Sequence, residues 1–320
     1  MHFKNLFFYF LIIACFYLEA QSPDDVYLDY LMEEFEEGSK DFDTFSEKHL
    51  QALSNGTIDA DAAYKVAVHF TNLIVRAGYF EEGGEELKEI VASSLIFAVV
   101  GGNKRAIPEL ASMYLLGWHV DQNFDAFDKY MRLAAKEDLL EGHAYIGKYY
   151  EIKDSKQEKM DALPSLRIAA QRKDPESMLI LGKAYLMGDV GIESKDPVKG
   201  LNLIKQASDS GHLESKNELC GILIFNEDVR DINAAIGHCP ATASKGDRWS
   251  QLALMYAYML SDNNVLCYAW AEIGLANKNF PQAEEMFNRQ FDETKSLCRE
   301  SMTKSQVRRA NDLVKKLTLN

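Results

Sequence analysis

The sequence of 320 residues contains little proline and glycine, with seven and nineteen of them. This scarcity argues against a β-sandwich and against a low-complexity chain. Beyond the first twenty residues there is no apolar run long enough to cross a bilayer. The formal net charge of −14 argues against nucleic acid as a partner, because the phosphate backbone would repel the chain.

Sequence motifs that carry chemistry are also few. The histidines form no i, i+4 pair and there is no Cys-x-x-Cys, so we expect no metal site. The chain lacks a glycine-rich phosphate loop and a Gly-x-Ser-x-Gly elbow. We therefore expect no cofactor and no catalytic residue.

The first twenty residues have the pattern of a secretory signal peptide. Lys4 supplies a positive charge, an apolar run covers residues 6–17, and Ala20 fits a small-residue cleavage site. We expect the mature chain to be periplasmic or secreted. Two alternatives remain open: an uncleaved N-terminal anchor, or a lipoprotein tethered to the membrane through a lipid on Cys15.

The rest of the chain contains internal repeats. Leu110-Ala111, Ile146-Gly147 and Leu181-Gly182 occupy one equivalent position, with spacings of 36 and 35 residues. Two weaker copies place Cys220-Gly221 and Leu252-Ala253 there. The five predicted repeats cover residues 106–142, 143–177, 178–215, 216–250 and 251–290.

Each repeat has the apolar spacing of two helices. One helix pair cannot bury both of its faces, so neighbouring pairs must stack. The sequence predicts an all-α fold, an α/α superhelical solenoid of about five to six antiparallel helix pairs. The remaining segments are an acidic helical leader at 21–60, a degenerate capping helix pair at 61–105 and a closing helix within 291–320.

The motifs resemble the Sel-one-like repeat, a relative of the tetratricopeptide repeat. Residues 106–142 and 178–215 fit its Leu-Gly-x-x-Tyr and Ala-Ala patterns best, and residues 267–290 resemble the C-terminal end of bacterial members. Solenoids of this kind present a long concave surface that binds peptides or domains. Together with the signal peptide, this favours an exported, non-enzymatic scaffold that binds an unidentified protein or peptide on its concave face.

Two other functions stay open at this stage. Some relatives have been linked to penicillin binding, and Ser301 with Lys304 forms a Ser-x-x-Lys pattern, although Ser301 also suits the N-cap of the closing helix. This is the basis for a β-lactam-binding or cell-wall-acting enzyme. Trp118, in a loop after Gly117, is the candidate exposed contact for peptidoglycan, a polysaccharide or a protein.

The resemblance also bears on the cysteines. Cys220 falls at the Leu position of a first helix and Cys239 at the Tyr position of the second helix in the same repeat. These positions face each other in such repeats, which implies a Cys220–Cys239 disulfide and leaves Cys267 to pair with Cys298. The alternative is buried free thiols, which behave as small apolar side chains.

Charge is unevenly distributed along the sequence. Residues 21–60 hold eleven acidic and two basic side chains, whereas residues 289–320 hold eight basic and four acidic ones. Because a solenoid keeps sequence order in space, these segments would lie at opposite ends. They would be two solvated caps or the basis of weak head-to-tail self-association, which salt should weaken.

Overall fold

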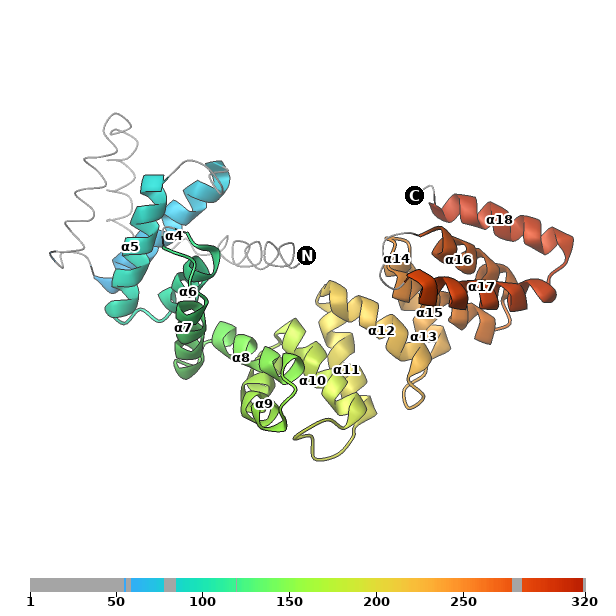
Figure 1. Cartoon of the computed structure of the whole chain (residues 1–320), viewed down its shortest axis with the longest axis horizontal. Coiled ribbons are helices and arrows are strands. Elements are labelled where there is room, and N and C mark those ends of the chain that lie inside the picture. The colour runs from blue at the N-terminus through green and yellow to red at the C-terminus, as the bar shows by residue number, and fades with distance from the viewer. Residues whose placement is uncertain (1–54, 56–58, 78–84, 119, 278–283, 319–320) are drawn as a thin grey trace. The chain divides into compact units, whose positions relative to one another are not determined.

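A computed structural model of the chain describes residues 55, 59–77, 85–118, 120–277 and 284–318. Within these residues there are fifteen helices and no strand (Figure 1). The predicted all-α class is therefore confirmed. The signal peptide, Cys15 and nearly all of the acidic leader lie outside the described residues. No helix among those described is long and apolar enough to span a membrane.

The chain divides into two compact units, Met1–Gly142 and His143–Asn320, which we call unit 1 and unit 2. Unit 1 contains helices that pack in chain order, each against the next. They are α4 (Ala60–Ala77), α5 (Glu85–Val100), α6 (Ala106–Leu116) and α7 (Phe124–Lys136). Ile74, Ile90 and Leu110 are fully buried in their shared core. The first two helices form the helix pair predicted for residues 61–105.

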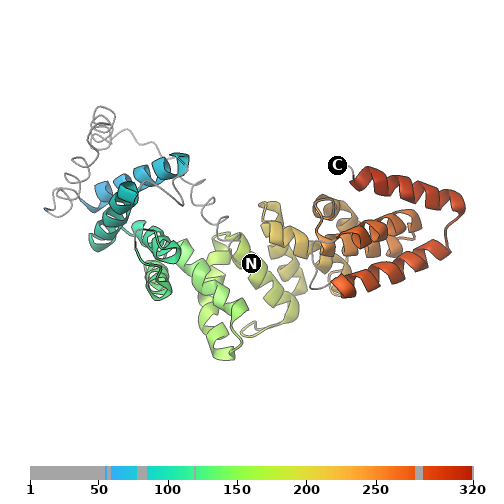
Figure 2. The same ribbon diagram turned by 45° about the horizontal axis from the view of Figure 1, so that its top comes forward.

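Unit 2 contains four helix pairs, the first of which begins three residues before the boundary at His143, and two further helices. The first helices of the pairs are each 13 residues long: α8 (Leu140–Ile152), α10 (Pro175–Met187), α12 (Leu213–Phe225) and α15 (Arg248–Leu260). The second helices are α9 (Lys156–Gln171), α11 (Pro197–Asp209), α13 (Ile232–His238) with α14 (Pro240–Ala243), and α16 (Asn264–Ala276). The chain then forms α17 (Glu284–Glu300) and α18 (Lys304–Thr318). Figure 2 shows α17 and α18 running in opposite directions.

Short polar side chains set where these helices begin. Asp174, Asp196 and Asp247 each accept a hydrogen bond from the backbone N–H three residues later. This satisfies one of the donors that a helix N-terminus leaves free. Proline follows directly after the first two of them, where it costs no hydrogen bond.

Small residues bring the two helices of a pair together. A Cβ added to Gly182 would lie 2.6 Å from Cγ1 of Ile204 and 2.8 Å from the carbonyl oxygen of Gly200. The same position in α8 is Gly147, whose added Cβ would lie 3.0 Å from Cα of Leu166. Glycine at this position therefore fixes how closely the first and second helices approach.

The helix bounds correct the register predicted for the two weaker repeats. Leu181 is the seventh residue of α10, and the seventh residues of α12 and α15 are Leu219 and Leu254. The sequence comparison placed Cys220 and Leu252 there, one and two residues away. Cys220 instead occupies the small-residue position of Gly147 and Gly182. The register of the fourth repeat was predicted wrongly because this repeat lacks the tyrosine that marks the others.

The C-terminal segment also differs from the prediction of a single closing helix. Two helices follow the last pair, and Arg248 at the start of α15 joins the first of them to the repeats. Its guanidinium is fully buried and donates to the carbonyl of Gly274 at 3.2 Å and to Oδ1 of Asn288 at 2.9 Å. The same group lies 4.9 Å from the ring centre of Phe287. One cation thus connects α15, α16 and α17.

Candidate interaction surface

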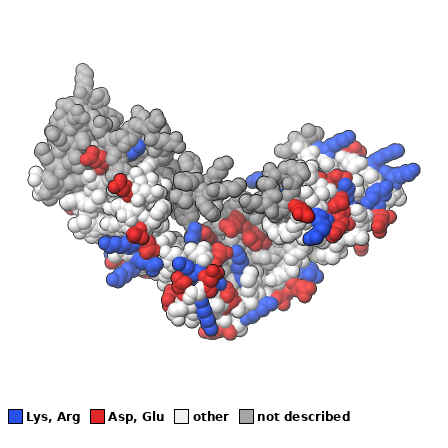
Figure 3. Space-filling view, in the orientation of Figure 1, with Lys and Arg blue, Asp and Glu red and all other residues white. Residues whose placement is uncertain are grey.

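The first helices of unit 2 share a surface crossed by ion pairs. Lys148 of α8 binds Glu176 of α10 at 2.8 Å, and Glu151 of α8 binds Lys183 of α10 at 2.6 Å. The two pairs follow the same order along both helices, so α8 and α10 run parallel. In Figure 3 acidic and basic side chains lie interspersed over this part of unit 2.

Lys183 lies where acidic side chains from two helices converge. Burial alone would lower its pKa, but the hydrogen bond and charge of Glu151 outweigh burial and raise it. The charges of Glu218 and Glu214 on α12 act in the same direction. Lys183 therefore stays charged and lies between α8 and α12.

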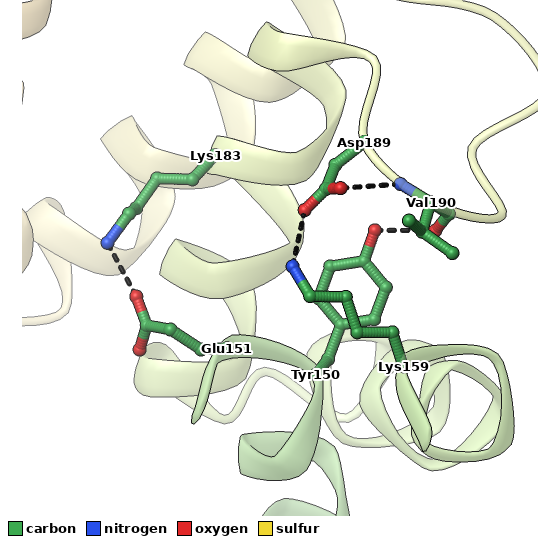
Figure 4. A network of polar contacts seen from close by, with 6 residues as sticks. All are labelled: Tyr150, Glu151, Lys159, Lys183, Asp189 and Val190. Atoms are coloured by element: carbon green, nitrogen blue, oxygen red, sulfur yellow. Dashed lines mark hydrogen bonds and ion pairs between the residues drawn. The ribbon is translucent and has the colours of Figure 1, made fainter. Parts of the chain in front are cut away.

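The loop between α10 and α11 is held by a second set of polar contacts, drawn in Figure 4. The hydroxyl of Tyr150 donates to the carbonyl of Val190 at 2.6 Å, and Lys159 of α9 binds Asp189 at 3.1 Å. Burial alone would raise the pKa of Asp189. The hydrogen bond from the Val190 N–H and the ammonium of Lys159 lower it by more, so the pKa of Asp189 is lowered overall. Burial also raises the pKa of Tyr150 to about 12. These contacts attach the loop to the preceding helix pair.

Contacts also join this loop to the next one. Lys195 binds Asp228, between α12 and α13, at 2.6 Å. Nε of Arg230 donates to the carbonyl of Ile224 at 2.9 Å in the last turn of α12. The loops of successive pairs therefore lie side by side along one edge of unit 2.

The tryptophans differ from each other in exposure. Trp118 was predicted as an exposed contact, but it is half-buried and packs against the core of unit 1. Trp270 is 4% exposed and belongs to the core of unit 2. Trp249, at the start of α15, is 49% exposed and contacts the ring of Phe287 edge-on at 5.0 Å.

The cysteines are paired as predicted at one site and not at the other. Cys267 of α16 and Cys298 of α17 form a disulfide. Cys220 and Cys239 are free buried thiols, so the predicted second disulfide is corrected. Their hydrogen bond lowers the pKa of Cys220, and the same bond together with burial raises that of Cys239.

Ser301 lies in an exposed turn between α17 and α18. The sequence suggested Ser301 as the N-cap of the closing helix, but it does not hold that position in α18. That position belongs to Thr303, whose N–H donates to Oε1 of Gln306 at 2.8 Å and whose hydroxyl accepts from the Gln306 N–H at 3.3 Å. No hydrogen bond joins Ser301 to Lys304 in the described part of the chain. Among the residues with described positions, no cluster of three metal-binding side chains was found.

No protein-family model matches the sequence, and no curated protein matches it significantly. Solved structures do. A Sel1 repeat protein from Oxalobacter formigenes is 16% identical over 81% of this chain and 98% of that one, with a TM-score of 0.49. A protective antigen of uropathogenic Escherichia coli strains with an SLR fold is 14% identical over 91% of this chain and 94% of its own, with a TM-score of 0.25. The chain is thus similar to proteins of the Sel1-like repeat class that its motifs resemble, and its own helix pairs establish the fold.

Proposed function

We propose that this chain is an exported, non-enzymatic scaffold that binds other proteins through the surface of the first helices in unit 2. The observation that carries the proposal is the set of ion pairs between α8 and α10, with Glu214 and Glu218 of α12 close by. Side chains from successive helices share one surface there, which suits a ligand that spans several repeats.

A photocrosslinking side chain can test this surface. It would be placed at Glu218, exposed on α12, and in a second variant at Gln206, exposed on the second helix α11. In the native organism we expect a discrete adduct with another protein from position 218 and none from position 206. Equal adducts from both positions, or none from either, would contradict the proposal.

Export is tested separately by the N-terminus of the mature chain. We expect chain in the periplasmic or secreted fraction to begin at Gln21, after cleavage behind Ala20. A lipid on Cys15 would establish the tethered alternative. An intact Met1 in a cytosolic fraction would refute export.

The enzyme alternative has a direct test at Ser301. A fluorescent penicillin should leave the folded chain unlabelled. Labelling that disappears in Ser301→Ala would replace the scaffold with β-lactam chemistry.

A further inference from the structure

Unit 2 exposes one large apolar side chain at the same position of every helix pair. Ile152, Met187, Phe225 and Leu260 are the last residues of the four first helices. They are 64%, 70%, 44% and 46% exposed, respectively. We call these four residues the apolar row. Exposed apolar residues are common singly, whereas a regular series of them marks a binding surface.

The contacts between pairs place the row along one edge of unit 2. The ion pairs between α8 and α10 show that these helices are parallel, and Lys195 and Asp228 join the loops after α10 and α12. The ring of Phe225 packs edge-on against Tyr256 of α15 at 5.4 Å. In Figure 1 the loops after α10 and α12 both extend from the lower side of unit 2.

Acidic side chains accompany the apolar row. An acid stands two residues after each of its members: Asp154, Asp189, Glu227 and Asp262. Asp189 is bound by Lys159, but the same loop also exposes Glu193. Glu227 is 89% exposed and lies 3.9 Å from Arg230. In the described region no ion pair engages Asp154, Glu193 or Asp262.

The basic side chains of these loops are already occupied by the chain itself. Lys153 binds Glu158 at 3.3 Å and Lys195 binds Asp228. Arg230 donates to the end of α12. The four loops contain eight acidic and three basic residues in all. The edge therefore carries a net negative charge beside its apolar side chains, which favours a basic ligand.

The spacing of the row indicates the conformation of that ligand. Among the first helices, α12 and α15 pack directly against each other, and the axes of helices in direct contact lie about 8–10 Å apart. A polyproline-type segment advances about 9 Å in three residues. Such a segment therefore matches the spacing of Phe225 on α12 and Leu260 on α15, with a basic side chain against the acidic loop after each helix.

We propose that the apolar row and its acidic loops bind an extended, basic segment of a partner protein that carries an apolar residue at every third position. This inference rests on the proposed scaffold function and names the chemistry of its ligand. It assigns that ligand to the loop edge, separate from the ion-paired surface of the first helices.

The test uses the full chain and a fluorescent peptide of five Leu-Pro-Lys repeats, with binding measured by anisotropy. The double variant Met187→Ser with Phe225→Ser should weaken binding at least tenfold. Leu213→Ser is the matched control, because Leu213 is 55% exposed at the opposite end of α12. Helical circular dichroism and a thermal melt would show that each variant is folded.

Charge is tested in parallel. Combining Asp154→Asn, Glu193→Gln and Asp262→Asn should weaken binding several-fold and reduce its dependence on salt. The control variant Asp209→Asn, at the far end of α11, should change neither the affinity nor its dependence on salt. Peptides of five Leu-Pro-Glu or Gly-Pro-Lys repeats should bind at least tenfold more weakly than the Leu-Pro-Lys peptide.

The inference is wrong if the row variant binds like Leu213→Ser or if the Leu-Pro-Glu peptide binds equally well. Crosslinking from position 218 without peptide binding would refute this edge site and leave the scaffold in place. Self-association that the row variant abolishes would assign the row to a second copy of the chain instead, and would also overturn the inference.

Discussion

Cys220 and Cys239 are buried in one core, and Cys220 holds the position at which Gly182 packs against Ile204 in the preceding helix pair. Both first-helix residues are eighth in their helices, and so are Ile204 in α11 and Cys239 when counted from the start of α13. The earlier helix pair combines a very small residue, Gly182, with the large Ile204. The later helix pair combines two cysteines of intermediate size. The approach of the two helices thus depends on the combined volume at this position.

Gly182→Ala should therefore destabilise unit 2. The added methyl group would overlap Ile204 and the backbone oxygen of Gly200, and overpacking of this kind costs about 1–3 kcal/mol. Urea unfolding would measure the loss. Ile204→Val should restore only part of it, because the Gly200 oxygen remains in place.

Gly237→Ala is the control for that experiment. Gly237 lies in α13, and an added Cβ would meet no atom within 4 Å. Alanine there should leave stability unchanged or raise it by about 0.5–1 kcal/mol through its better helix propensity. Equal stability of Gly182→Ala and the unchanged chain would refute close packing at the first position.

Removing the disulfide should loosen the C-terminal end of unit 2. Cys267 and Cys298 are 31 residues apart in sequence, and closing a loop of that length contributes about 3–4 kcal/mol in the chain-entropy model. Cys267→Ala with Cys298→Ala should lose that amount in denaturant unfolding. A reductant should lower the free energy of unfolding of the unchanged chain to that of the double variant. It should not change the stability of the double variant itself. A reductant effect of equal size on both chains would show that the disulfide is not its source.

Tyr150→Phe should release the loop between α10 and α11. Tyr150 is 2% exposed, and the change removes its hydrogen bond to the Val190 carbonyl. We expect a loss of about 1 kcal/mol and faster hydrogen exchange in residues 188–196. Tyr185→Phe is the comparison, since its hydroxyl accepts an exposed hydrogen bond from Lys199. Exchange that rises equally in both variants would argue against this anchoring role.

Glu109 should make the stability of unit 1 fall as the pH rises. Burial of its carboxyl group and the charge of Glu141 raise its pKa well above the ordinary 4.5. The Tyr64 hydroxyl donates to Oε1 at 3.0 Å, with Arg105 also close enough to act on Tyr64. The folded chain therefore holds a proton that the unfolded chain releases above pH 4.5, and this contribution to stability is lost as the pH rises toward the folded pKa.

Glu109→Gln keeps the shape of the side chain without the ionisation. It should flatten this pH dependence and raise the thermal midpoint at neutral pH. Melts recorded from pH 4 to pH 8 would measure both effects. An unchanged slope would mean that another group carries the dependence.

Much of the fold could be predicted from the sequence, because each helix pair repeats small residues and helix caps at fixed spacing. The register of the weaker repeats did not, since Cys220 lies beside Leu219 and either residue suits an apolar anchor. Pro240, which separates α13 from α14, further obscured the second helix of that pair.

The surface was harder to predict than the core. Apolar spacing along the sequence does not distinguish Met187, which is 70% exposed, from Leu186, which is 4% exposed. Only the helix ends show that Ile152, Met187, Phe225 and Leu260 are equivalent. The sequence spacing of Cys220 and Cys239 also could not predict that both are free thiols, because two cysteines can lie close together without forming a disulfide.

The buried guanidinium of Arg248 sets a minimum length for any working fragment of unit 2. Arginine keeps its charge at all ordinary pH values, so the group cannot become neutral when its surroundings are removed. A fragment cut after α16 would lose Asn288, Phe287 and the disulfide partner of Cys267 together. The last repeat and α17 should therefore fold and unfold as one block.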